Sequence, residues 1–136
     1  VNHAVNRLRA VPRALAVGSS IVYIYFNDLD KIYQFGPYGP MHATAGTFAF
    51  KRELLKQTKY DDDAELAEEK AFLKNYTIPL VQLDPLKSIL VCAHQYNTFD
   101  KRKLLVNPHP NFVRETKLRP KLFIRDKTMR EFYTTV

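Results

Sequence analysis

The chain of 136 residues contains no tryptophan, a single cysteine and no long hydrophobic segment. A lone cysteine, Cys92, excludes an internal disulfide and fits a reducing compartment. Within its apolar run it is more typical of a small buried side chain than of a nucleophile. Without about eighteen consecutive apolar residues, no membrane-spanning helix is expected. The absence of tryptophan, with the other aromatic residues concentrated in expected strands, leaves no clear platform for stacking nucleic-acid bases.

Acidic residues are fewer than basic ones, because the chain has 14 Asp and Glu against 21 Lys and Arg and therefore a net charge of +7. This balance favours anionic partners such as phosphates, nucleotides or acidic surfaces. Much of the excess follows Asp100, where scattered basic residues are typical of a solvated helix face. Charge alone does not make a nucleic-acid-binding protein, and nucleic acid is not expected as a partner.

The length allows one domain at most. The first residue is not a methionine, and the apolar residues Val1, Val5 and Leu8 already have the spacing of a helix. We therefore expect the chain to continue a longer polypeptide, with a trimmed leader as the alternative. No apolar secretion segment follows the basic start, and a cytoplasmic location is expected.

β-branched and aromatic runs alternate with segments of helical spacing, which predicts an α/β fold. The glycine and proline residues between 36 and 40 predict a loop. The expected strands cover residues 15–17, 21–26, 32–35, 46–50, 78–82 and 89–93, and the expected helices cover residues 1–10, 51–59, 61–75 and 121–133.

Carboxylates gather on the third expected helix. Glu65 and Glu69 share one face, with Glu68 about 100° away, because residues four apart on a helix are neighbours. Near a cleft, one of them could have a raised pKa and accept a proton. The alternative is a solvated face neutralised by Lys70 and Lys74.

Two aspartate groups could bind a divalent metal, but plainer interpretations are favoured. Residues 61–63 are three aspartates that suit the positive N-terminal end of a helix. Asp28 and Asp30 have the Asp-x-Asp form that binds a metal diphosphate, yet they lie in an ordinary turn after a strand. Neither group is assigned to a metal site.

His94 directly follows an apolar strand. A histidine at the carboxyl end of a strand can reach a ligand or metal in the crevice of an open α/β sheet. Hydrogen bonding to backbone is the alternative role. His3, His42 and His109 are too dispersed to suggest a zinc site.

Five segments, in this order and spacing, resemble the GT-A-type glycosyltransferases of the inverting, family-2-like branch. The closest likeness is to a version found in giant DNA viruses, and it covers roughly half of the chain. The segments are residues 35–39, 42–51, 67–73, 82–85 and 94–102.

The resemblance implies a C-terminal half of a GT-A, Rossmann-like domain, with a mixed sheet and flanking helices. Residues 1–106 would belong to this half-domain, and residues 107–136 would form a basic extension with a helix. The nucleotide-binding half, with its metal-holding Asp-x-Asp, would precede Val1.

The resemblance also implies roles for individual residues. The small-residue turn Thr44, Ala45, Gly46 and Thr47 would lie beside the donor sugar, and Lys51 is expected to bind substrate with it. Glu68 and Glu69 match the family's acidic motif, whose second position is usually Asp and acts as the general base. His94 matches a late histidine near the metal or diphosphate.

The implied reaction transfers a sugar from a nucleotide-sugar donor to a hydroxyl of a glycan or protein acceptor, with inversion. A divalent cation, Mn²⁺ or Mg²⁺, would be held chiefly by residues before Val1, so we expect the isolated chain to be inactive. The alternative is a catalytically inactive structural protein, for instance a virion component, that retains the half-fold.

Overall fold

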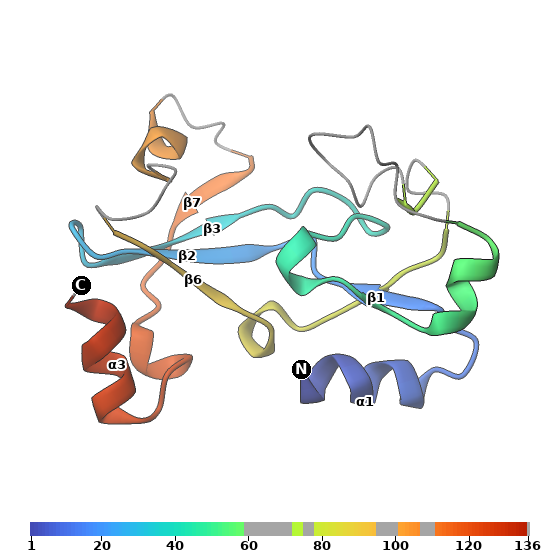
Figure 1. Cartoon of the computed structure of the whole chain (residues 1–136). Coiled ribbons are helices and arrows are strands. Elements are labelled where there is room, and N and C mark those ends of the chain that lie inside the picture. The colour runs from blue at the N-terminus through green and yellow to red at the C-terminus, as the bar shows by residue number, and fades with distance from the viewer. Residues whose placement is uncertain (59–71, 75–77, 95–100, 107–110, 136) are drawn as a thin grey trace. The chain divides into compact units, whose positions relative to one another are not determined.

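The structure is a computed structural model that describes residues 1–58, 72–74, 78–94, 101–106 and 111–135 (Figure 1). Its chain separates into two compact units. Unit 1 comprises Val1–Ile21 and Pro37–Ser88, and unit 2 comprises Val22–Gly36 and Ile89–Val136. Each unit contains a mixed sheet, so the predicted α/β class is confirmed at this level.

The sheet of unit 1 is built around β1 (Ala16–Gly18). β1 pairs antiparallel with β4 (Ala49–Phe50) and parallel with β5 (Val81–Gln82), which gives the order β4-β1-β5. All three residues of β1 are buried, as expected for a central strand covered on both faces.

Apolar side chains from several loops pack against this small sheet. Phe72 is fully buried, and its ring centroid lies 4.8 Å from that of Phe50 and 5.6 Å from that of Phe48. The aromatic cluster fixes the position of the segment that carries β4. The buried members of this core are Ala16, Ala43, Leu54, Phe72, Leu73, Ile78 and Leu80.

Helix α1 (Asn2–Ala10) begins unit 1 and runs alongside β1 (Figure 1). The predicted helix at the start of the chain is therefore confirmed. Its N-terminus has no side-chain cap and none of its residues is buried, so few of its contacts are with the core. The helix ends at Ala10, where the helix expected over residues 1–10 also ends, and Pro12 follows directly after its C-cap.

Unit 2 contains a four-stranded sheet of order β6-β2-β3-β7. β2 (Val22–Phe26) and β3 (Lys31–Phe35) form a hairpin across the turn at residues 27–30. β6 (Leu90–Ala93) runs parallel to β2, and β7 (Val113–Glu115) runs antiparallel to β3. The three longest strands coincide closely with the sequence prediction.

One side of this sheet carries a core of Ile24, Phe26, Phe35 and Ala93. Helix α3 (Lys127–Thr134) follows a short 3₁₀ turn (Pro120–Leu122) near the end of the chain. The helix expected over residues 121–133 thus begins six residues later. The reason is local, because Asp126 caps the helix by accepting a 2.8 Å hydrogen bond from the backbone amide of Met129.

The strand expected over residues 46–50 is wrong in its first half. Residues Ala45–Thr47 form a 3₁₀ turn, and only Ala49 and Phe50 extend the sheet. Three further boundaries differ. Gly18, one residue beyond the strand expected over residues 15–17, is the last residue of β1. Only Val81 and Gln82 of the strand expected over residues 78–82 join the sheet, and the expected helix over residues 51–59 is a 3₁₀ helix (Arg52–Lys56). The expected helix over residues 61–75 falls largely outside the described residues.

Within the described part of the chain, no helix combines the length and the hydropathy that a bilayer crossing requires. The expected division at residue 106 is not tested by these observations and stays a prediction.

Gly18 occupies a position that has no room for a side chain. A Cβ atom placed there would lie 2.4 Å from the Cβ atom of buried Ala43 and 3.5 Å from its Cα atom. The 37–43 loop can approach β1 closely because residue 18 is glycine.

We expect Gly18→Ala to lower the free energy of unfolding by about 1–3 kcal/mol, because the core must shift to accept one methyl group. Urea denaturation followed by circular dichroism measures the change. Gly39→Ala is the matched control, since a Cβ atom there has only the Cβ atom of His42 at 4.0 Å. Equal stability of the two variants would contradict the close packing of Gly18.

Candidate functional site

The residues predicted to bind substrate all belong to unit 1, whereas His94 belongs to unit 2. Thr44 precedes the 3₁₀ turn Ala45–Thr47, and Lys51 lies directly after β4. The predicted catalytic pair, Glu68 and Glu69, lies outside the described residues.

The Thr47 hydroxyl fixes the turn to the segment that follows β1. It accepts a 2.9 Å hydrogen bond from the backbone amide of Ser19, and the backbone amide of Thr44 donates to the Ser19 carbonyl at 2.8 Å. The hydroxyl is also 2.9 Å from the Thr44 carbonyl and 3.0 Å from the Thr44 hydroxyl. Because Thr47 and Ser19 are both buried, these bonds are shielded from water.

The side-chain amide of Gln82 joins three neighbouring backbone segments. Its Oε1 accepts from the Ser20 amide at 2.9 Å, while its Nε2 donates to the carbonyls of Pro40 and His42, each at 2.9 Å. Backbone groups that no sheet ladder could satisfy therefore find partners in one side chain. The amide holds the 40–42 loop beside the 19–20 segment, and thus beside the turn.

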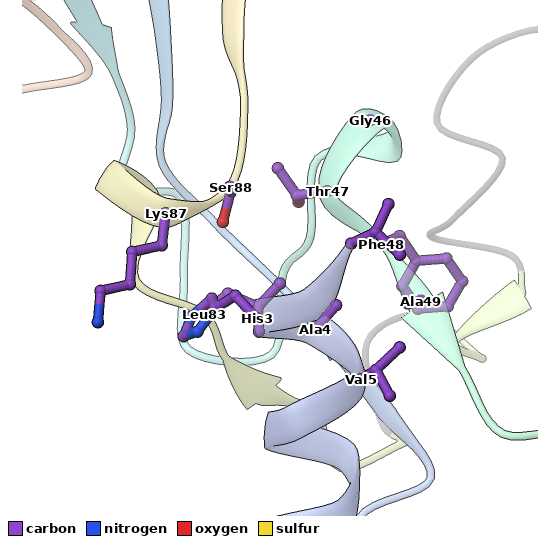
Figure 2. A pocket seen from close by; sticks show the side chains of 11 residues that line it. His3, Ala4, Val5, Gly46, Thr47, Phe48, Ala49, Leu83, Lys87 and Ser88 are labelled. Atoms are coloured by element: carbon purple, nitrogen blue, oxygen red, sulfur yellow. The ribbon is translucent and has the colours of Figure 1, made fainter. Parts of the chain in front are cut away.

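A pocket of about 190 Å³ opens beside the turn, entirely within unit 1 (Figure 2). Most of its exposed wall is apolar, and Gly46 itself is exposed at the surface. Side chains from α1, from the turn and β4, and from the segment after β5 come together around it. The lining residues are Val1, His3, Ala4, Val5, Gly46, Thr47, Phe48, Ala49, Leu83, Lys87 and Ser88.

The polar part of this wall is organised by Asp84. The Asp84 backbone amide donates to Nε2 of His3 at 3.0 Å, and the Asp84 carbonyl accepts from the Ser88 hydroxyl at 2.9 Å. Its carboxylate caps the next 3₁₀ turn by accepting from the Leu86 amide. These bonds hold α1 against the 83–88 segment and orient the His3 ring.

Two of the five predicted substrate-binding residues, Gly46 and Thr47, line the pocket. Thr44 is committed to the turn's own hydrogen bonds. The ammonium group of Lys51 donates to the Pro12 carbonyl at 3.0 Å. The sequence interpretation did not assign His3 and Ser88 to this site, because residues so distant along the chain meet only in the folded structure.

His94 directly follows β6, the apolar strand expected before it, and β6 runs parallel to β2. β6 ends at Ala93, whose carbonyl accepts from the Asn27 amide at 3.2 Å just after β2. A cavity of about 10 Å³ is lined here by Phe26, Asn27, Asp28, Ala93, His94, Lys101 and Arg102.

The described residues do not make a complete metal site around His94. The neighbouring Asp28 carboxylate already pairs with Arg102 at 2.8 Å. Among the described residues, no three His, Cys, Asp or Glu side chains converge in a way that would hold a cation. His94 is therefore given no catalytic step that passes through a metal.

Asp30 is engaged in a second polar cluster of unit 2. Its carboxylate accepts from the Tyr25 hydroxyl at 2.7 Å and from the Arg119 guanidinium at 2.7 Å. Arg119 also donates to the Asp30 carbonyl at 2.8 Å, which stabilises a residue whose φ is 50°. Asp28 and Asp30 thus each have a basic partner, which agrees with leaving them out of a metal site.

This cluster shifts the pKa values of both acids. Burial of the phenol, together with the hydrogen bond to Asp30, raises the pKa of Tyr25 to about 12. The hydrogen bonds from Tyr25 and Arg119 lower the pKa of Asp30. The contribution of this cluster to the free energy of unfolding is therefore largest at pH values above the ordinary Asp pKa and below the ordinary Tyr pKa.

No family model, no curated protein and no solved structure matches this chain.

We expect one tyrosine to form its phenolate near pH 12 in a titration of the folded chain followed at 295 nm. Tyr25→Phe removes this component. Since the folded pKa is raised, the stabilisation is complete below the unfolded Tyr pKa of about 10 and is lost as the pH rises toward 12. Burial also raises the pKa of Tyr38, so Tyr38→Phe is the control that separates burial from the Asp30 cluster, and it should keep the component near pH 12. Persistence of the component in Tyr25→Phe would refute the assignment.

Proposed function

We propose that this chain is part of an inverting, nucleotide-sugar-dependent glycosyltransferase of the GT-A type, and that it supplies the acceptor side and the general base. The order and spacing of the five segments that resemble this family support the proposal. The single structural observation that supports it best is the pocket beside the Ala45–Thr47 turn, because this turn belongs to the segment with the longest resemblance.

The size of the pocket favours a small ligand group. Its volume of about 190 Å³ lies below the ~300 Å³ at which pockets for drug-sized ligands begin. One sugar ring suits such a space, whereas a whole nucleotide sugar does not. This size agrees with the proposal that the pocket holds the sugar ring and that other residues bind the nucleotide.

The wall chemistry also suits a sugar ring. Apolar side chains such as Val5 and Phe48 can pack against the C–H face of a ring, while the His3 ring, held by the Asp84 amide, forms part of the wall. Gly46 allows the closest approach, since it has no side chain. In this proposal Thr47 shapes the turn through its bond to Ser19, and the exposed backbone at Gly46 meets the substrate.

The proposed reaction is a single displacement. The acceptor oxygen attacks the anomeric carbon while the bond to the departing diphosphate breaks on the opposite face. Glu69 takes the proton of the acceptor hydroxyl, with Glu68 beside it in the same acidic motif. A divalent cation would neutralise the departing diphosphate, and the resemblance implies that residues outside this chain would supply most of its ligands.

Glu69→Gln in the full-length polypeptide tests the proposal. With a panel of nucleotide-sugar donors and Mn²⁺, we expect the parent protein to transfer sugar and the variant to lose about 10²–10⁴-fold in turnover, because glutamine cannot accept the proton. Product formation is measured by mass spectrometry of the acceptors.

Glu53→Gln is the matched control, since Glu53 is an exposed glutamate of the same unit on the 3₁₀ helix after Lys51. It should keep the parent turnover. Unchanged turnover in Glu69→Gln would remove Glu69 from the reaction. Absence of transfer with every donor would favour the inactive structural protein instead.

A further inference from the structure

Helix α3 exposes its apolar side chains. Met129, Phe132 and Tyr133 are spaced i, i+3 and i+4, so they share one face of the helix. They are 48%, 63% and 40% exposed, and Leu122 of the preceding 3₁₀ turn is 48% exposed. We name these four side chains the α3 patch.

Polar contacts of Arg130 hold α3 to the segment that precedes it. Arg130 is half-buried, and its guanidinium donates to the carbonyls of Ile124 at 3.0 Å and Arg125 at 3.2 Å. Phe123 packs the preceding turn against Tyr23 of β2, with ring centroids 5.7 Å apart. Arg130 and Thr134 are the half-buried residues of the helix, whereas Met129, Phe132 and Tyr133 remain exposed to solvent.

Such an arrangement differs from scattered surface hydrophobic residues, which need no explanation. The rings of Phe132 and Tyr133 contact each other edge to face at 5.1 Å, so they form one surface. An exposed apolar surface of this kind, formed by neighbouring side chains of one helix, is typical of an interaction site.

The charge around the patch indicates an anionic partner. Residues 117–135 carry six Lys and Arg against two Asp and Glu, a net charge of +4. Lys121 of the 3₁₀ turn, Arg125 of the connection and Lys127 at the start of α3 are all exposed. Their long stems can lie along an apolar surface while the charged ends remain in a polar layer.

We infer that the α3 patch binds the surface of an anionic lipid bilayer. An amphipathic helix with basic flanks lies in the interface plane with its apolar face in the acyl boundary. A fluid bilayer accepts an outward apolar face without a matching groove, and the exposed Lys121, Arg125 and Lys127 complement its anionic head groups.

This binding is independent of the proposed transferase activity. It needs no membrane-spanning helix and would place unit 2 on a membrane surface whether or not the polypeptide transfers sugar. The exposed basic residues would add electrostatic attraction to an anionic leaflet.

Co-sedimentation of the chain with phosphatidylcholine vesicles, made with and without phosphatidylserine, tests the inference. We expect binding to the anionic vesicles, weakened as salt rises from about 0.1 M to 1 M because the Debye length falls from ~10 to ~3 Å. Phe132→Ser lowers the partition coefficient by at least about tenfold, since Phe132 is the most exposed of the four patch side chains.

Leu55→Ser is the matched control, because Leu55 is a 52% exposed apolar residue of unit 1 that does not belong to the α3 patch. It should bind like the parent chain, and circular dichroism confirms that both variants fold. Lys121→Glu with Arg125→Glu should abolish the preference for phosphatidylserine.

Three results would overturn the inference. The first is equal binding of Phe132→Ser and the parent chain to anionic vesicles. The second is absence of binding to those vesicles together with binding to an oligonucleotide. The third is a vesicle-free dimer, seen by sedimentation equilibrium, that Phe132→Ser disrupts.

Discussion

The hydrogen bond between the Thr47 hydroxyl and the Ser19 amide is the interaction on which the arrangement of unit 1 depends. It joins residues 28 positions apart at the point where β1 ends and the polar turn begins. Gln82 reinforces it from β5, because its amide holds the 40–42 loop beside the same segment. Leaving the buried Ser19 amide without a partner would cost about 1–3 kcal/mol, and this cost favours the observed conformation of the turn.

The position of the candidate site follows from this constraint. With Thr47 turned inward, Gly46 remains exposed, and the next residues lead into β4 and the aromatic cluster around Phe72. Asp84 builds the opposite wall by holding His3 and Ser88. The hydrogen-bonded turn and an apolar wall meet at one small pocket, where the proposal places a single sugar ring. Unit 2 has separate chemistry, in which Asp28 and Asp30 are neutralised by arginines and α3 presents its apolar face outward.

The parts of the fold that could be predicted are those encoded by local patterns. The β-branched and aromatic run before Asn27 predicted β2, and the apolar run before His94 predicted β6, because short buried strands have that composition. The strand expected from Gly46 was wrong because a side-chain bond to a distant residue outweighed local propensity. β7 was missed, since three residues of mixed polarity form a strand only through the edge that β3 offers. The meeting of His3 with Asp84, 81 positions away, has no signal in a single sequence.

Hydrogen exchange at the Ser19 amide in Thr47→Val and Thr47→Ser tests the central claim most directly. Valine has the shape of threonine but cannot accept a hydrogen bond, whereas serine keeps the hydroxyl. A lost bond of about 1–2 kcal/mol predicts Ser19 exchange roughly 5–30-fold faster in Thr47→Val, with near-parent exchange in Thr47→Ser. Equal protection of the Ser19 amide in both variants would contradict the claim that the Thr47 hydroxyl holds the turn.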